Sequence, residues 1–388
     1  MYFYGGGSYS DFFNMGEYSR MGYEFNRENI SIFDTTLRDG EQTPGVSFNT
    51  DQKYKIAKML YDAGVNIIEA GFPAVSNDEM KSIKKINHDM ENICSLARCN
   101  RNDIDKVIES DSRIIHLFIA TSDIHMKYKL KKTREQVFDS IMESIDYARS
   151  YGMRIIFSPE DATRTSMDFL KQIVSSIKVE TINFPDTIGI MNPISMYYFI
   201  NKIKSFTSTG ISIHCHNDFG MATANTLAGL MAGANEAQVT VNGIGERAGN
   251  ASLEEVVSSI YGFLNSYTDI KMEKLYSISK YVSAASGIIP QKNKAITGEN
   301  AFSHEAGIHV QGIINNPKTY EAINPEIFGL NRRIVIGKHS GKAAIKYILE
   351  NNGMHKTDDE IDNILQIVKK EGNKTIDDKF LLEVARNE

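Results

Sequence analysis

Gly210-Ile-Ser-Ile-His-Cys-His-Asn-Asp218 holds in a few residues the pattern that decides the fold of this 388-residue chain. A short run rich in isoleucine leads directly into a cluster of polar side chains. Similar runs rich in Ile, Val and Phe recur along the sequence, with stretches of helical periodicity between them. The strands expected on this basis are residues 30–34, 65–70, 93–97, 114–120, 154–158, 181–184, 210–214 and 237–241.

Eight such strands, one every ~30 residues, predict an α/β fold of the TIM (β/α)8 barrel type. Continuous apolar strands imply burial on both faces, as in a parallel sheet. The segments 52–63 and 133–149 carry the helical periodicity expected between them. An open doubly wound sheet is the alternative, but no glycine-rich phosphate fingerprint follows the first strand.

Three parts are expected along the chain. Residues 1–29 form an aromatic and glycine-rich extension of the barrel, which lacks the apolar region of a signal peptide. Residues 30–267 form the catalytic barrel, and residues 268–388 form small, mainly helical C-terminal subdomains that begin with a helix at 274–286. The charged tail at 343–387 is expected to be amphipathic helix, too short for a second core.

Composition narrows the class of protein. With 41% hydrophobic and 24% charged residues, the chain is typical of a soluble globular protein. A net charge of −6 and the lack of basic stretches interleaved with aromatics argue against nucleic-acid binding; the lysine-rich run 127–134 is expected to open a solvated helix. Three cysteines without disulfide or zinc spacing favour a reducing cytoplasm. No stretch is apolar enough to span a membrane.

The polar clusters of the sequence follow strands, where a TIM barrel carries its catalytic groups. They lie after the first, fifth, sixth, seventh and eighth expected strands, at residues 34–42, 158–161, 185–187, 214–218 and 242–250. Because the carboxyl ends of all eight strands meet at one end of the barrel, these clusters should converge there.

His214 and His216 are the most specific local signal. Residues two apart on a strand project to the same side, so both imidazoles could bind one divalent cation. A pair of hydrogen-bonded barrel histidines is the alternative. The carboxylate of Asp39 and the amide oxygen of Asn250 could complete the ligand set, which suits Mg, Mn, Zn or Co because it contains no thiolate.

A metal with open positions could chelate the carboxylate and ketone oxygens of a 2-oxo acid. Arg38 could neutralise charge developing on the ketone oxygen, and Glu160 could act as a base or position one. Both residues could equally be structural members of ion pairs. Asp34 and Asp186 are expected to orient the ligands.

Three motifs together resemble the 2-isopropylmalate and homocitrate synthase family. The first is Leu37-Arg-Asp-Gly-Glu-Gln42 with Lys53, the second is His214-Cys-His-Asn-Asp-Phe-Gly-Met-Ala-Thr-Ala224, and the third is Asn242-Gly-Ile-Gly-Glu-Arg-Ala-Gly-Asn250. The resemblance extends from about residue 31 to 347. It implies a TIM barrel followed by small subdomains, active as a homodimer.

The resemblance also implies roles for individual residues. Metal ligands would be Asp39, His214 and His216, with Asn250 close by or bound. Arg38 and Gln42 would stabilise the reacting ketone and the enolate of acetyl-CoA. The 2-oxo acid pocket would be lined by His116, Ser158 and Thr187, and Glu160 would be a catalytic carboxylate. His309 and Tyr320 would be catalytic residues that reach into the partner's barrel.

The implied activity is that of an acyltransferase that condenses acetyl-CoA with a 2-oxo acid and then hydrolyses the thioester. Asp39, together with segments 115–125 and 183–189, favours 2-oxoisovalerate as the substrate and 2-isopropylmalate as the product. This reaction is the first committed step of leucine biosynthesis. The chain is expected to be a short form of the enzyme without the leucine regulatory domain. The alternatives are 2-oxoglutarate, as in homocitrate synthase, and pyruvate, as in citramalate synthase. A lyase that uses the same metal site without CoA, and a catalytically inactive paralogue, are more distant alternatives.

Overall fold

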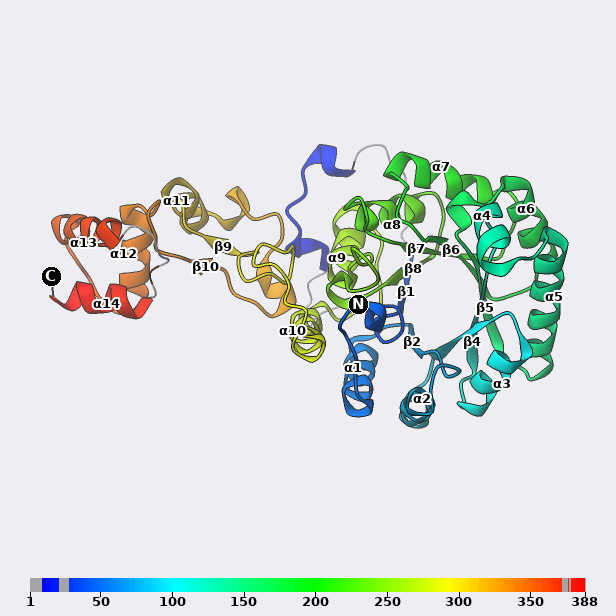
Figure 1. Ribbon diagram of the computed structural model, residues 1–388. Helices are drawn as coiled ribbons and strands as arrows, with labels where there is room; N and C mark the ends of the chain where they lie inside the picture. Colours follow the sequence, from blue (N-terminus) through cyan, green and yellow to red (C-terminus); the bar gives the residue numbers. More distant parts are fainter. Residues whose placement is uncertain (1–8, 21–27, 372–375, 377, 388) are drawn as a thin grey trace. The chain divides into compact units, whose positions relative to one another are not determined.

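The computed structural model describes residues 9–20, 28–371, 376 and 378–387 (Figure 1). The contacts within the chain divide it into two compact units. The barrel unit is Arg20–Ile289, and the C-terminal unit combines Met1–Ser19 with Pro290–Glu388.

Eight parallel strands close into a barrel in sequence order, which confirms the predicted TIM-barrel fold. The ring closes at β1, which pairs with β2 through Phe33 and Ile67 and with β8 through Ile32 and Ala237. The strands are β1 (Ser31–Asp34), β2 (Ile67–Gly71), β3 (Ile93–Arg98), β4 (Ile114–Ala120), β5 (Arg154–Glu160), β6 (Thr181–Asp186), β7 (Gly210–Cys215) and β8 (Glu236–Val239).

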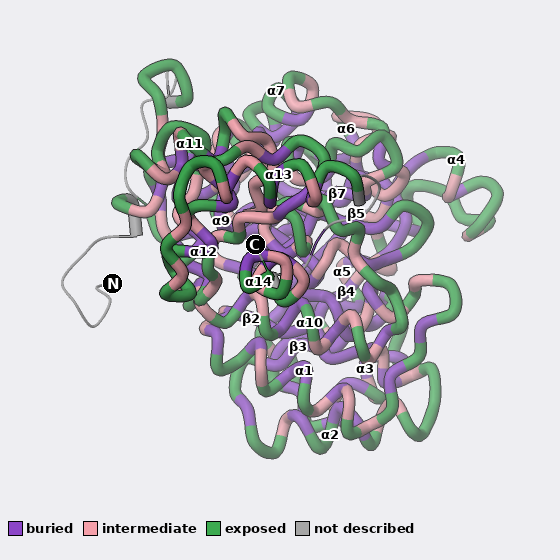
Figure 2. The backbone as a smooth tube through the Cα atoms, turned by 90° about the vertical axis from the view of Figure 1, so that its left-hand side faces the viewer, coloured by how far each residue is buried: buried purple, intermediate pink, exposed green. Residues whose placement is uncertain are grey.

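Helices surround the strands, as Figure 1 shows, and Figure 2 colours much of the strand backbone as buried. They are α1 (Thr50–Ala63), α2 (Asn77–Asp89), α3 (Arg101–Glu109), α5 (Arg134–Ser150), α6 (Met167–Ser176), α7 (Pro193–Lys204), α8 (Ala222–Met231), α9 (Leu253–Phe263) and α10 (Leu275–Ser286). Local chemistry sets where they begin: Asn49 and Thr133 each form a capping box with a glutamine three residues later. In α1, Ile56 and Leu60 bury one face of the helix.

Two local expectations differ from the structure. The barrel was expected to end near residue 267, but α10 packs against α1 and belongs to the barrel unit. The run 127–134 does not open a single helix. It passes through a short helical turn, Met126–Leu130, and the chain then breaks at Lys131, whose φ of 53° is left-handed, before Thr133 caps α5.

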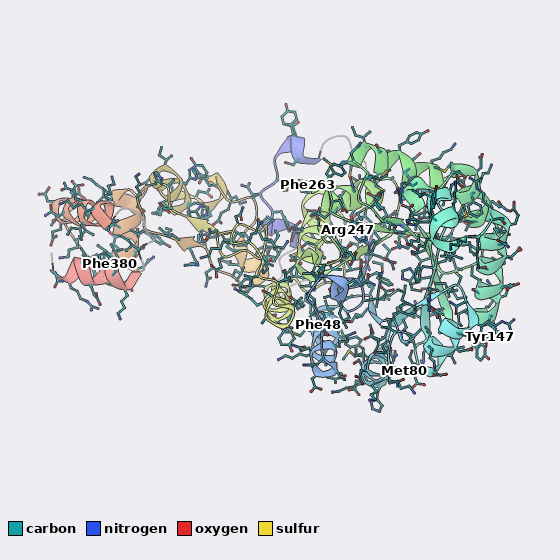
Figure 3. The ribbon with its side chains drawn as sticks, in the orientation of Figure 1. Phe48, Met80, Tyr147, Arg247, Phe263 and Phe380 are labelled. Carbon is teal, nitrogen blue, oxygen red and sulfur yellow. The ribbon has the colours of Figure 1, made fainter. Side chains whose placement is uncertain are left out.

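The C-terminal unit has a hydrophobic core of its own. Its elements are α11 (Gly307–Asn315), α12 (Lys342–Asn351), α13 (Asp358–Glu371), α14 (Asp378–Asn387) and the paired strands β9 (Ser303–His304) and β10 (Arg333–Ile334). Val310 of α11 and Ile336 join the apolar residues of the last three helices, and Phe380, labelled in Figure 3, packs against them. The tail supplies most of this core, and Val310 and Ile336, which precede the tail, complete it.

The described N-terminal residues pack within the C-terminal unit, although they were expected to extend the barrel. Phe13 forms an antiparallel bridge with Ile323, and the amide of Asn324 donates to the carbonyl of Phe12 at 2.8 Å. The remainder of the aromatic stretch, residues 1–8 and 21–27, lies outside the described residues. No helix among those described is long and apolar enough to cross a membrane.

Candidate active site

A cavity of about 330 Å³ opens at the carboxyl ends of the barrel strands. Its lining combines the polar clusters that follow the strands with a few apolar side chains. The residues are Arg38, Asp39, Gln42, Phe72, Leu96, His116, Phe118, Lys129, Ser158, Glu160, Asn183, Pro185, Thr187, His214, His216, Glu246 and Arg247. The predicted convergence of the polar clusters is thus found in the structure.

Asp39, His214 and His216 form a compact buried group whose candidate ligand atoms all lie within 4.8 Å of one another. Nε2 of His214 lies 3.2 Å from Oδ2 of Asp39 and 3.2 Å from Nε2 of His216. His214 is on β7, His216 follows it, and Asp39 is placed by backbone and hydroxyl contacts with Thr35 at the end of β1.

The charge states of this group suit a cation. Burial alone would raise the pKa of the Asp39 carboxyl, but Arg38 and the two histidines outweigh burial and hold that pKa well below its usual range. Burial, reinforced by His214, lowers the pKa of His216 to about 3. A carboxylate and a neutral imidazole are the deprotonated forms that bind a metal.

The orientation of the histidines is also suitable. Nδ1 of His214 lies 3.2 Å from Oε1 of Gln238, an oxygen that can only accept, so Nδ1 carries the proton and Nε2 is free to bind an ion. His216 is held by an isolated bridge between its backbone and that of Asn250. Within the described part of the chain, Nδ1 of His216 has no hydrogen-bond partner. The donor set therefore fits a divalent metal site.

Asn250 lies close to the candidate ligand group, beside Asp39. Its amide nitrogen donates to Oδ2 of Asp39 at 3.0 Å and to the carbonyl of Ile244 at 3.2 Å. Its Oδ1, the predicted ligand atom, is buried and has no partner among the described residues. Asn250 therefore contacts the candidate ligand Asp39 through its side-chain nitrogen.

A buried hydrogen-bond chain connects Arg38 to the pocket residues across several strands. Glu69 of β2 accepts from Nε of Arg38 at 2.7 Å and pairs with Nδ1 of His116 at 2.7 Å. Nε2 of His116 lies 2.6 Å from Oγ of Ser158, which also accepts from Nδ2 of Asn183 at 2.7 Å. Three predicted pocket residues, Arg38, His116 and Ser158, thus share one network.

Glu69 is central to this network, although no motif of the sequence indicates a role for it. Burial would raise its pKa, but Arg38 and His116 outweigh burial and lower it to about 2. The carboxylate is thus an obligatory acceptor that orients the donors on Arg38 and His116. The available signal was a charged residue inside the apolar run Ile67–Gly71, which is rare unless the charge is paired. Gln238 and Asn183 were also not predicted. They leave the same kind of signal, because each is a polar residue inside a strand.

The remaining predicted pocket residues lie around the rim. Glu160 lines the cavity and pairs with Nζ of Lys129 at 2.6 Å. Oγ1 of Thr187 accepts from the backbone amide of Asp161 at 3.0 Å, which ties the loops after β5 and β6 together. Gln42 ends the short 3-10 helix Gly40–Gln42 and also lines the cavity.

The side chains of Asp34 and Asp186 accept from backbone amides beside the site, and the backbone carbonyl of Asp186 accepts from the amide of His216 at 3.4 Å. Oδ1 of Asp34 accepts from the amide of Thr36 at 2.9 Å. Asp186 accepts from the amides of Ile190 and Met191 and thereby shapes the loop after β6. Both aspartates act on backbone next to the site, whereas Gln238 orients His214.

His309 and Tyr320 belong to the C-terminal unit. Their rings stack with centroids 4.2 Å apart and an interplanar angle of 29°. Gly312, one turn along α11 from His309, leaves room for the Tyr320 ring, because a Cβ at this glycine would lie 2.7 Å from Cε2 of the tyrosine. The two predicted catalytic side chains are thus neighbours, although they are eleven positions apart in the sequence.

The barrel and its carboxyl-end site define the class of protein: the chain belongs to the HMGL-like family, whose model matches residues 29–282. Residues 296–375 match the homocitrate synthase post-HMGL domain-like model. A 2-isopropylmalate synthase of Saccharolobus solfataricus is 52% identical over 372 residues, covering 93% of this chain and 96% of the relative. An (R)-citramalate synthase of Methanocaldococcus jannaschii is 46% identical over 364 residues, covering 92% of this chain and 74% of the relative.

Among solved structures, the HMG-CoA lyase of Bacillus subtilis is similar with a TM-score of 0.62. The identity is 21%, and the match covers 70% of this chain and 98% of the lyase. At this identity the likeness supports the barrel fold alone.

Proposed function

We propose that this chain is an acyltransferase that condenses acetyl-CoA with 2-oxoisovalerate to give 2-isopropylmalate and CoA, the first committed step of leucine biosynthesis. The observation that carries the proposal is the buried Asp39–His214–His216 group beside the Arg38–Glu69–His116 network, in a chain whose relatives in archaea include 2-isopropylmalate synthases of about half identical sequence.

The residues divide the work of binding and chemistry. Asp39, His214 and His216 would hold Mn, Mg, Zn or Co, which would supply Lewis-acid polarisation of the 2-oxo acid's ketone. Arg38, held by Glu69, faces the charge that develops on the ketone oxygen. Gln42 would stabilise the enolate of acetyl-CoA, and Asn250 would steady Asp39.

A base must remove a proton from the acetyl methyl group before the new carbon–carbon bond can form. We assign this step to His309, stacked on Tyr320, since Glu160 is engaged by Lys129 at 2.6 Å. The enolate carbon then attacks the ketone carbon, and the ketone oxygen takes up a proton. Water cleaves the thioester, which releases CoA and a carboxylate.

The lining of the cavity favours a short apolar side chain on the 2-oxo acid. Phe72, Leu96 and Phe118 supply apolar surface. Among the described residues, the cations of the lining are Arg38, Lys129 and Arg247, and each is already paired with a carboxylate. Arg38 pairs with Glu69, Lys129 with Glu160, and Arg247 with Asp218. Arg247 is labelled in Figure 3. The distal carboxylate of 2-oxoglutarate would therefore lack a cation and should be rejected.

The test is thiol release from acetyl-CoA, measured with a panel of 2-oxo acids. We expect the highest kcat/KM for 2-oxoisovalerate. Pyruvate and 2-oxobutyrate should be slower by about 10- to 200-fold per methylene lost, and 2-oxoglutarate slower still. A higher value for 2-oxoglutarate would make the chain a homocitrate synthase. A higher value for pyruvate would make it a citramalate synthase, as its relative in Methanocaldococcus jannaschii is named.

We also propose a homodimer with shared active sites, in which His309 and Tyr320 of one subunit serve the barrel of the other. The test mixes two inactive variants, His309→Ala and Arg38→Ala. Because one type of hybrid site would contain both native residues, exchange of subunits should restore part of the activity. Verified exchange without recovery would contradict shared sites.

A further inference from the structure

The N-terminal residues 11–14, here called the strap, pair with the loop that carries Tyr320. The Tyr320 loop is residues 316–324. The amide of Asn14 donates to the carbonyl of Ala322 at 2.8 Å, and the amide of Asn324 donates to the carbonyl of Phe12 at 2.8 Å. Phe13 lies between these two bonds, is buried, and bridges Ile323 in antiparallel fashion. The strap therefore pairs with this loop in the way that a short antiparallel strand would.

The side chain of Asn14 holds the loop at two points around Tyr320. Its Nδ2 donates to the carbonyl of Lys318 at 2.7 Å and to the carbonyl of Glu321 at 3.1 Å. These carbonyls lie two residues before and one residue after Tyr320. Since a primary amide has two N–H groups, one side chain can fix both carbonyls at once.

The opposite side of the loop is also restrained. Glu321 is buried and accepts from Nε of Arg332 at 3.0 Å and from Nη2 at 3.2 Å. The Tyr320 side chain, in contrast, is 45% exposed, and among the described residues its ring stacks only on that of His309. Packing does not enclose this ring, so its position depends on how firmly the loop backbone is held.

We propose that Asn14 is a positioning residue for Tyr320, and that this is the function of the strap. The inference rests on the proposed role of the His309–Tyr320 pair in proton transfer. It assigns a task to the N-terminal segment, for which the sequence motifs suggest none. Loss of the Asn14 contacts should let the Tyr320 ring leave His309 without disturbing the barrel cavity.

The test replaces Asn14 by Asp, which has the same shape but cannot donate to the two carbonyls. We expect kcat to fall about tenfold, as for two lost hydrogen bonds near the reacting groups, while KM for both substrates changes less than twofold. Asn14→Ser, which keeps one donor, should be intermediate. Hydrogen exchange should rise in residues 316–324, a readout that does not depend on activity.

A double-mutant comparison separates positioning from general destabilisation. In a Tyr320→Phe background, Asn14→Asp should cause no further loss of kcat, because Asn14 affects kcat only by positioning the tyrosine hydroxyl. The matched control is Asn87→Asp in the barrel unit, where Asn87 also donates to a backbone carbonyl, that of Ser110 at 3.0 Å. It should lower thermal stability and leave kcat unchanged.

Two results would overturn the inference: an Asn14→Asp enzyme with wild-type kcat and unchanged exchange, or an equal fractional loss of kcat with and without the Tyr320 hydroxyl. Failure of the proposed function is a separate outcome. It would appear as a wild-type protein that releases no thiol with any 2-oxo acid.

Discussion

Two buried carboxylates of the barrel, Glu69 and Glu236, behave in opposite ways. Glu69 has its pKa lowered to about 2, because Arg38 and His116 outweigh the effect of burial. Glu236 begins β8 and is equally enclosed. Its carboxylate accepts from a neutral hydroxyl, Oγ of Ser31, at 3.2 Å, and burial raises its pKa to about 7.

The comparison shows that burial does not decide the charge of a carboxylate in this barrel; the partners do. Donors placed around Glu69 keep it ionised, so it can hold the side chains of Arg38 and His116 in fixed positions. Among the described residues, the donors to Glu236 are neutral serine hydroxyls, so Glu236 is easier to protonate.

The largest effect should come from removing a candidate metal ligand at the carboxyl end. His216→Ala should reduce turnover by about a thousandfold, since Lewis-acid assistance contributes several kcal/mol. The fold should survive, as judged by circular dichroism, because the barrel core does not depend on this ring. Chelation of the wild-type protein should have the same effect and should be reversed by adding metal. Turnover that persists after exhaustive chelation would contradict the metal site.

A smaller loss is expected when Glu69 loses its charge. Glu69→Gln keeps the shape but presents an N–H group to donors on Arg38 and His116, so both should shift. We expect kcat/KM to fall by about 10- to 100-fold, as for other residues that orient catalytic groups. The matched control is Glu180→Gln, which removes a carboxylate paired with Arg154 away from the cavity lining. If both variants lost activity equally, Glu69 would have no special role.

The smallest effect concerns stability at the amino end. The folded pKa of Glu236, about 7, lies above the value of 4.5 usual for this group. As pH rises between these values the unfolded state ionises first, so the glutamate's contribution to stability is present below pH 4.5 and is lost by pH 7. Glu236→Gln should therefore raise the unfolding free energy at pH 8 by about 1–2 kcal/mol. This is a part of the free energy that the difference between the folded and unfolded pKa values implies.

The check on this prediction is urea unfolding of both proteins at pH 8 and at pH 4.5. The gain from Glu236→Gln should shrink at the lower pH, where the native carboxyl is protonated in the wild type. A gain that is independent of pH would show that ionisation of Glu236 does not limit stability.

Most of the barrel could be predicted from the sequence because its signals are local. An apolar run of strand length, a capping box such as that at Thr133, and two histidines on one face of a strand are each contained in a few consecutive residues. The grouping of Asp39, His214 and His216 could be predicted as well, because the carboxyl ends of the parallel strands meet at one end of the barrel. The end of the barrel unit and the core of the C-terminal unit could not, because they depend on which distant apolar faces pack together.

By itself, then, the sequence determined the eight strands, the polar clusters that follow them and the gathering of Asp39, His214 and His216. Only the tertiary structure decided that Glu69 holds Arg38, that Gln238 orients His214 and that Asn14 holds the Tyr320 loop. The physical reason is range: periodicity and capping act over a few residues, whereas these hydrogen bonds join residues 24 to 304 positions apart in the chain.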